Sequence, residues 1–296
     1  MIVLNFGGGV NSTALLVEAH RRGLRPDVIV FSDTGSEMPH TYTHLAEMQD
    51  WLNARSWPAI DVVRWIRKRD SQTKRKPDGT FTVLRSAKKG DFVTIEQQCL
   101  EGKELPSKAY GLSGCTVKWK QQPIDEFLAA HARVVVEHAA GRTVERWIGY
   151  DADEPQRAAR MVEKNPRPDL WTWRSPLVEW DMGRDECIEA IGVHGAGLKA
   201  PRKSACFFCP SSTKKDVLHL RDTYPDLFAR ALAIEDGAAP NLRTRKGLGQ
   251  SAFAWRTFVE ETDAREAAKK KGLPVVADTT PDLTADIACG CYDGEA

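Results

Sequence analysis

The chain of 296 residues lacks the features that mark membrane, fibrous or repetitive proteins. No apolar run approaches the ~18–20 residues that cross a bilayer, and there is no internal repeat or low-complexity segment. No basic stretch and apolar segment precede the first apolar run, residues 2–6. We therefore expect no signal peptide, a cytoplasmic location and no membrane partner.

The chain also has no large excess of one charge, because its 42 Lys and Arg residues are balanced by 41 Asp and Glu residues. The whole chain is therefore not attracted to nucleic acid, although local basic patches can be. Seven cysteines, an odd number, do not suggest a disulfide framework in a reducing compartment, and they look more like ligands or reactive thiols. Cys187, beside Ile188 on an amphipathic helix pattern, is expected in the core.

Apolar runs alternate with helical patterns along the first half of the chain. We predict strands at residues 2–6, 27–31, 60–65 and 144–150, with helices after the first two. This order predicts an α/β fold with a doubly wound, mainly parallel sheet. The polar residues 66–114 are too long for an ordinary connection and indicate an insertion. From about residue 182 the pattern is mainly helical, and Thr213 with Asp216 predicts a capping box.

A glycine loop, Gly7-Gly8-Gly9-Val10-Asn11-Ser12-Thr13, lies between the first strand and its helix. Backbone N–H groups and the positive helix end at such a turn suit a phosphate, and Ser12 and Thr13 can add hydroxyl donors. The loop lacks the Gly-Lys-Ser/Thr ending of a P-loop and the third glycine of the Rossmann fingerprint. It predicts a phosphate site, with a tight strand-to-helix turn as the alternative.

A second motif, residues 33–39 (Asp-Thr-Gly-Ser-Glu-Met-Pro), follows the second strand at the sheet edge where α/β proteins bind ligands. The two motifs together resemble the PP-loop ATP pyrophosphatases, in the branch of phosphoadenylyl-sulfate (PAPS) reductases and related sulfurtransferases. That family has Ser-Gly-Gly-x-Asp-Ser in the first loop, so Gly7 replaces its first Ser and Asn11 its Asp. Its Asp-Thr-Gly-x-Glu-x-Pro segment is matched by Asp33, Thr34, Gly35, Glu37 and Pro39.

Two further segments extend the resemblance to about residue 215. Residues 148–154 with Arg157 are similar to the family's Gly-x-Arg-x-x-Glu-x-x-Arg stretch, with Tyr150 in place of the usual Arg. Residues 173–180 are similar to its Pro-Leu-x-x-Trp segment. The resemblance implies an adenine nucleotide α-hydrolase-like domain at 1–180, interrupted by the insertion at about 66–114. A mainly helical region with a CxxC motif and a flexible tail then covers 181–296.

Four cysteines form a candidate metal site. Cys206 and Cys209 make a CxxC motif in a late loop, and Cys99 and Cys115 lie in the insertion. Four thiolates suit zinc or a [4Fe–4S] cluster, while burial of Cys99 and Cys115 as small hydrophobes is the alternative. Residues 115–120 (Cys-Thr-Val-Lys-Trp-Lys) resemble the Cys-Thr-x-x-Lys element of sulfur-handling family members. That resemblance implies that Cys99, Cys115, Cys206 and Cys209 hold a [4Fe–4S] cluster, with zinc as second choice.

Two more cysteines, Cys289 and Cys291, lie in the tail. PAPS reductases carry a Glu-Cys-Gly nucleophile in a mobile tail, and here Ala288 stands where the Glu would be. The resemblance makes Cys289 a candidate nucleophile, and the chance occurrence of two thiols is the alternative.

The resemblance implies an enzyme that binds ATP with Mg²⁺, cleaves it between the α- and β-phosphates and activates an acceptor for sulfur transfer. A sulfur donor protein is then an expected partner. The basic residues between Arg64 and Lys89 make tRNA or DNA a candidate acceptor, although a solvated flexible loop is the more common explanation for such a run. The implied nucleotide-binding residues are Gly7, Gly8, Gly9, Asn11, Ser12, Thr13, Asp33, Thr34, Gly35, Gly149 and Arg157, and the implied catalytic residues are Asp33, Glu37 and Cys289.

Two rival functions remain open. One is a thiol-dependent PAPS reductase that uses Cys289. The other is a catalytically silent nucleotide-binding module with a structural zinc, in which Gly7 and Asn11 mark the loss of activity.

Overall fold

The computed structural model describes residues 1–68, 73–75, 81–83, 88–106, 108–109, 112–275, 277–280 and 282. For residues 73–75, 81–83, 108–109 and 112–113 the description covers the backbone alone.

The centre of the protein is a five-stranded parallel sheet with the strand order β3-β2-β1-β8-β9. The strands are β1 (Ile2–Asn5), β2 (Val28–Ser32), β3 (Ile60–Val63), β8 (Val144–Ile148) and β9 (Trp171–Arg174). The order reverses at β1, which creates a switch point at the carboxyl edge between β1 and β8. The predicted α/β fold with a doubly wound parallel sheet is confirmed, whereas β9 had no counterpart among the predicted strands.

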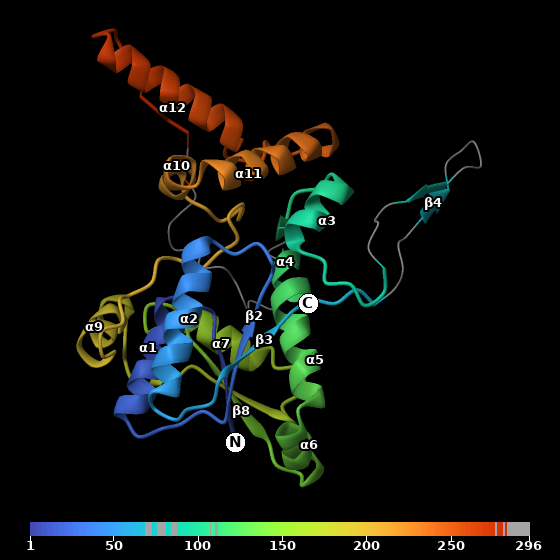
Figure 1. Ribbon diagram of the computed structural model, residues 1–296, viewed down its shortest axis with the longest axis vertical. Coiled ribbons are helices and arrows are strands. Elements are labelled where there is room, and N and C mark those ends of the chain that lie inside the picture. Colours follow the sequence, from blue (N-terminus) through green and yellow to red (C-terminus); the bar gives the residue numbers. More distant parts are fainter. Residues whose placement is uncertain are drawn as a thin grey trace.

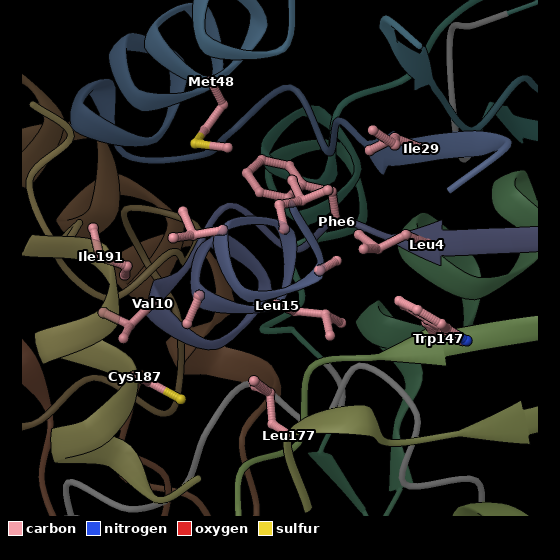
Figure 2. Close-up of a cluster of buried hydrophobic side chains, with 14 of the residues drawn as sticks. Leu4, Phe6, Val10, Leu15, Ile29, Met48, Trp147, Leu177, Cys187 and Ile191 are labelled. Carbon is pink, nitrogen blue, oxygen red and sulfur yellow. The ribbon is translucent and has the colours of Figure 1, made fainter. Parts of the chain in front are cut away.

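Helices cover both faces of the sheet because neighbouring residues of each strand point to opposite sides. Leu4 of β1 packs with α1 (Val10–Arg21), α2 (Pro39–Asn53) and α9 (Arg184–His194), as Figure 2 shows for Leu15, Met48 and Ile191. Val3 instead packs with α5 (Gln122–Ala130) and α6 (Ala132–Ala139) on the other face. The fully buried Cys187 of α9 belongs to the first core, as predicted.

The predicted insertion follows β3, and it contains short elements. A hairpin of β4 (Thr73–Arg75) and β5 (Phe81–Val83) extends away from the main sheet (Figure 1). It is followed by α3 (Ile95–Gly102), the β6 (Lys108–Ala109) and β7 (Leu112–Ser113) pair, α4 (Gly114–Thr116) and a π-helical turn, η1 (Val117–Gln121). α7 (Pro155–Glu163) lies between β8 and β9, and α8 (Pro176–Glu179) follows β9.

The C-terminal part is helical, as predicted, and builds a second core with the insertion. It contains α10 (Lys214–Thr223), α11 (Pro225–Ala238), η2 (Ala239–Asn241) and α12 (Trp255–Lys270), and Thr213 with Asp216 forms the predicted capping box. Residues of α3, η1, the CxxC loop and α10–α12 share one apolar cluster, with Phe208 fully buried within it. Figure 1 shows this helical part beyond the end of the sheet where α3 lies. Within the described residues, no helix has the length and hydropathy to cross a bilayer.

Candidate phosphate loop and thiol pocket

The glycine loop joins β1 to the N-terminus of α1 and presents an open row of backbone donors. The N–H groups of residues 7–12 form no hydrogen bond within the described part of the chain, whereas the N–H of Thr13 donates to the Gly9 carbonyl. Gly8 has a positive φ of 72°, a conformation that favours glycine. The hydroxyls of Ser12 and Thr13 both donate to the Gly9 carbonyl, at 3.1 and 2.9 Å. In this structure the loop therefore offers backbone N–H groups to an anion, and these two hydroxyls stabilise the loop.

Asn11 connects the loop to a carboxylate at the end of β8. Its Nδ2 donates to Asp151 at 2.8 Å, and its Oδ1 accepts from Arg184 Nη1 at 2.8 Å. Asp151 is only 3% exposed, and this burial raises the pKa of its carboxyl group despite the bond from Asn11. A carboxylate thus lies beside the position where the resembled family has its Asp. The sequence analysis missed Asp151, whose signal was its place directly after a predicted strand.

Gly149 packs against the glycine loop, whereas the contacts given for Arg157 are with its own segment. A Cβ at Gly149 would lie 3.0 Å from the Ser12 nitrogen, so this glycine lets β8 approach the start of α1 closely. Arg157 pairs with Glu154 and lies over the Tyr150 ring, 4.6 Å from its centroid. These contacts are local, so binding of nucleotide by Arg157 stays a prediction.

Asp33 organises the turn after β2. Its Oδ1 accepts hydrogen bonds from the Gly35 N–H and the Tyr42 hydroxyl, both at 2.8 Å, and its Oδ2 accepts one from Arg64 Nε at 2.9 Å. Burial, together with the neighbouring Asp33 carboxylate, raises the pKa of Tyr42 and keeps its hydroxyl a donor. The buried Asp33 is thus engaged on both oxygens by the protein itself. The predicted direct role of Asp33 in catalysis or nucleotide binding stays a prediction.

The next residues of the turn form a buried polar network. Thr34 Oγ1 donates to Glu37 Oε1 at 3.0 Å and lies 3.3 Å from Cys206 Sγ. Lys120 Nζ forms an ion pair with Glu37 Oε1 at 3.5 Å, and the Glu37 side chain is fully shielded from solvent. η1 brings Lys120 here because the Ser32 hydroxyl donates to the Trp119 carbonyl at 2.6 Å. A carboxylate, an ammonium group and a thiol therefore meet at the edge of the sheet.

The CxxC loop is held against the same turn by backbone hydrogen bonds. The N–H of Met38 donates to the Ala205 carbonyl at 2.9 Å, and the N–H of Phe207 donates to the Ser36 carbonyl at 3.0 Å. This short antiparallel pairing fixes Cys206 beside Glu37. The motif after β2 and the CxxC motif, about 170 positions apart, are thus parts of one site.

Three of the four predicted ligand cysteines, Cys115, Cys206 and Cys209, line one small pocket of about 20 Å³. Thr116 also lines it, and its buried Oγ1 has no hydrogen-bond partner in the described chain. The Ser211 N–H donates to Cys209 Sγ at 3.4 Å. Cys99, on α3, does not line the pocket but is buried in the neighbouring apolar cluster.

The described part of the chain contains five cysteines, namely the three pocket cysteines with Cys99 and Cys187. Across the described ranges no three His, Cys, Asp or Glu side chains are grouped closely enough to hold a metal ion. The donor chemistry fits a thiolate-bound metal, and the pocket has room for about one water-sized atom. Binding of a metal centre would therefore require the segments that carry these cysteines to change position.

The basic stretch and the tail are described in part. Arg64 pairs with Asp33 and Lys68 with Glu126, both through side chains that stay more than half exposed, whereas Arg67 is buried. The side chains of residues 69–87 lie outside the described part, as do Cys289 and Cys291. The nucleic-acid partner and the catalytic role of Cys289 stay predictions.

Comparisons with known proteins do not extend this description. No protein-family model matches the chain, and a search of curated proteins finds no significant relative. What the structure establishes is an α/β protein whose five-stranded parallel sheet carries a glycine loop and a thiol pocket along one edge.

Proposed function

We propose that this protein is an adenylylating enzyme of the PP-loop type that cleaves ATP between its α- and β-phosphates and activates an acceptor for sulfur transfer. The observation that carries the proposal is the open row of N–H groups at residues 7–12, at the switch point of a parallel sheet. Oriented N–H groups and a helix N-terminus suit a polyphosphate. The PAPS reductase-like sequence motifs support the choice of an adenine nucleotide.

The chemistry follows from positioning and charge. The N–H groups of the loop bind the phosphates and stabilise the negative charge that moves onto the leaving pyrophosphate. AMP is transferred to an acceptor oxygen, and a sulfur nucleophile later displaces it. Asp151, held by Asn11 beside the loop, is the carboxylate best placed to bind Mg²⁺, which would neutralise phosphate charge.

The second part of the proposal is a metal centre at the thiol pocket. We propose that Cys115, Cys206, Cys209 and Cys99 become thiolate ligands of a metal centre when the segments that carry them close around it. The sequence resemblance favours a [4Fe–4S] cluster, which would hold or deliver sulfur, and the pocket size favours a single zinc ion. Lys120 lies beside these thiols, and its positive charge reduces the repulsion between an anionic centre and the phosphates.

Measurements of nucleotide binding and turnover test the proposed binding and cleavage of ATP. Calorimetry should show ATP binding to the wild type, and pyrophosphate should be released from ATP. Gly8→Asp should abolish both, because a carboxylate would occupy the anion site. Gly141→Asp is the matched control, since Gly141 has a φ of 70° and no atom near its Cβ position.

Wild-type protein that binds no ATP would refute the proposal, as would Gly8→Asp with normal affinity. ATP binding without pyrophosphate release would favour the silent module, and release of sulfite from PAPS that depends on Cys289 would favour the reductase.

Metal analysis of anaerobically purified protein tests the proposed metal centre. A cluster gives broad visible absorption that bleaches with dithionite, whereas zinc gives a colourless protein with stoichiometric metal. Cys206→Ser should lose the metal and Cys187→Ser, in the other core, should keep it. Retention of metal in Cys206→Ser, or its loss in Cys289→Ser, would refute this ligand set.

A further inference from the structure

The space beside Gly8 is enclosed by three side chains from different segments. Around the position that a Cβ of Gly8 would take, Thr41 Cγ2 lies at 3.2 Å, Phe31 Cε2 at 3.5 Å and Ser204 Oγ at 3.5 Å. Two of these atoms are hydrocarbon. Of these three nearest atoms, Ser204 Oγ is the polar one.

The Ser204 hydroxyl is buried and has no hydrogen-bond partner among the described residues. Burial of a hydroxyl without a partner is unfavourable, and such groups in folded proteins usually mark a missing water, ion or ligand. The row of N–H groups at residues 7–12 also has no partner in this part of the structure. Donors from two distant segments therefore lie together at one place, and no acceptor for them is present in the described chain.

The backbone around Ser204 is held on both sides. His40 Nε2 lies 3.1 Å from the Lys203 carbonyl oxygen, and the Met38 N–H donates to the Ala205 carbonyl at 2.9 Å. α2 and the turn before it therefore fix the position of Ser204 next to the loop. A preorganised donor loses little conformational freedom when it binds a ligand.

We propose that Ser204 is a phosphate-binding residue, whose Oγ–H donates to a phosphate oxygen of a nucleoside triphosphate bound at residues 7–12. This inference rests on the proposed function and adds a ligand from a segment 190 residues further along the chain. The same segment carries Cys206 two positions later, so one stretch of backbone lines both the phosphate site and the thiol pocket.

The test is calorimetry of wild type and Ser204→Ala with ATP and with inorganic tripolyphosphate. We expect about a tenfold loss of affinity for both ligands, the typical effect of a hydrogen bond to a charged group. The melting temperature without ligand should stay the same or rise, because the hydroxyl has no protein partner to lose. Ser251→Ala, in an exposed turn before α12, is the control and should leave affinity unchanged.

Each contrary result has a distinct meaning. Unchanged affinity of Ser204→Ala for tripolyphosphate, or a lower melting temperature without ligand, would overturn the role of Ser204. Wild-type protein that binds neither ligand would instead overturn the proposed function on which the inference rests.

Discussion

Glycines of the three sequence motifs around the site are required for different physical reasons. Gly8 and Gly35 both have a φ of 72°, and a Cβ at Gly35 would also lie 2.5 Å from Thr94 Cγ2. Gly149 has no such conformation but lies against the backbone of residues 11 and 12. The proposed nucleotide site therefore depends on close packing as much as on direct contacts.

Gly149→Ala tests this dependence. The added methyl group would lie 3.0 Å from the Ser12 nitrogen, so the start of α1 should shift and ATP affinity should fall at least tenfold. Calorimetry with ATP measures the effect. Gly192→Ala is the matched control, because Gly192 is an exposed helical position with no atom near its Cβ, and it should stabilise α9 by ~0.5–1 kcal/mol. Equal ATP affinity of the two variants would contradict the proposed packing role.

Asp33 is predicted to stabilise the turn after β2. In Asp33→Asn an amide NH₂ would face either the Arg64 guanidinium or the donors of Gly35 and Tyr42. We expect the free energy of unfolding to fall by ~2–3 kcal/mol, measured by denaturant titration. Tyr42→Phe, which removes one of the three hydrogen bonds, should cost about 1 kcal/mol. Loss of ATP turnover at full stability would show instead that Asp33 acts directly on the substrate.

His44 of α2 forms a hydrogen bond with Thr13 and so connects α2 to the glycine loop. Its Nε2 lies 2.8 Å from Thr13 Oγ1, and because that hydroxyl donates to the Gly9 carbonyl, His44 must be the donor in this contact. The ring also stacks on Phe6 in the core. Burial lowers the pKa of His44 below its ordinary value of 6.5, against the opposing effect of Glu47.

Stability should therefore fall on acidification from pH 7 towards pH 5. The unfolded chain takes up a proton near pH 6.5 while the folded protein resists it until a lower pH, so the free energy of unfolding declines across this interval. His44→Gln should reduce the slope, and His40, whose pKa is also lowered by burial, should account for part of what remains. Unfolding curves at several pH values, with His194→Gln at an exposed site as control, measure this. An unchanged slope in His44→Gln would show that another group controls the response.

The CxxC loop attaches the second hydrophobic core to the turn after β2. The first core lies between the sheet and α1, α2 and α9, and the second joins the insertion to α10–α12. Phe207 and Phe208 belong to the second core, while the backbone of the same loop pairs with the turn after β2. The thiol pocket therefore depends on the attachment of the helical part to the sheet.

Phe208→Ala should destabilise this junction by ~3–5 kcal/mol and make Cys206 and Cys209 more reactive. Alkylation of each cysteine, followed by mass spectrometry, measures the reactivity. Leu15→Ala in the first core should cost a comparable ~2–5 kcal/mol but leave these two thiols protected under native conditions. Equal protection of Cys206 and Cys209 in both variants would contradict the claim that the thiol pocket depends on the attachment of the helical part to the sheet.

The sequence by itself determined the class of fold, because hydrophobic periodicity and capping are local properties of the chain. The alternating runs predicted β1, β2, β3 and β8, and Thr213 with Asp216 predicted the start of α10. The glycine loop was placed correctly between β1 and α1 for the same reason. β9 was missed although Pro168 and Pro176 flank it, because four residues are too short a run to show a strand period.

Tertiary structure alone decided which distant residues form the site. Asp151, Lys120 and Ser204 approach the loop and the turn from β8, η1 and the CxxC segment, and no local pattern encodes such long-range contacts. It also left Cys99 outside the lining of the thiol pocket and gave Asp33 three partners within the protein. These arrangements depend on how helices pack on the sheet, which is a property of the folded chain as a unit and not of its segments.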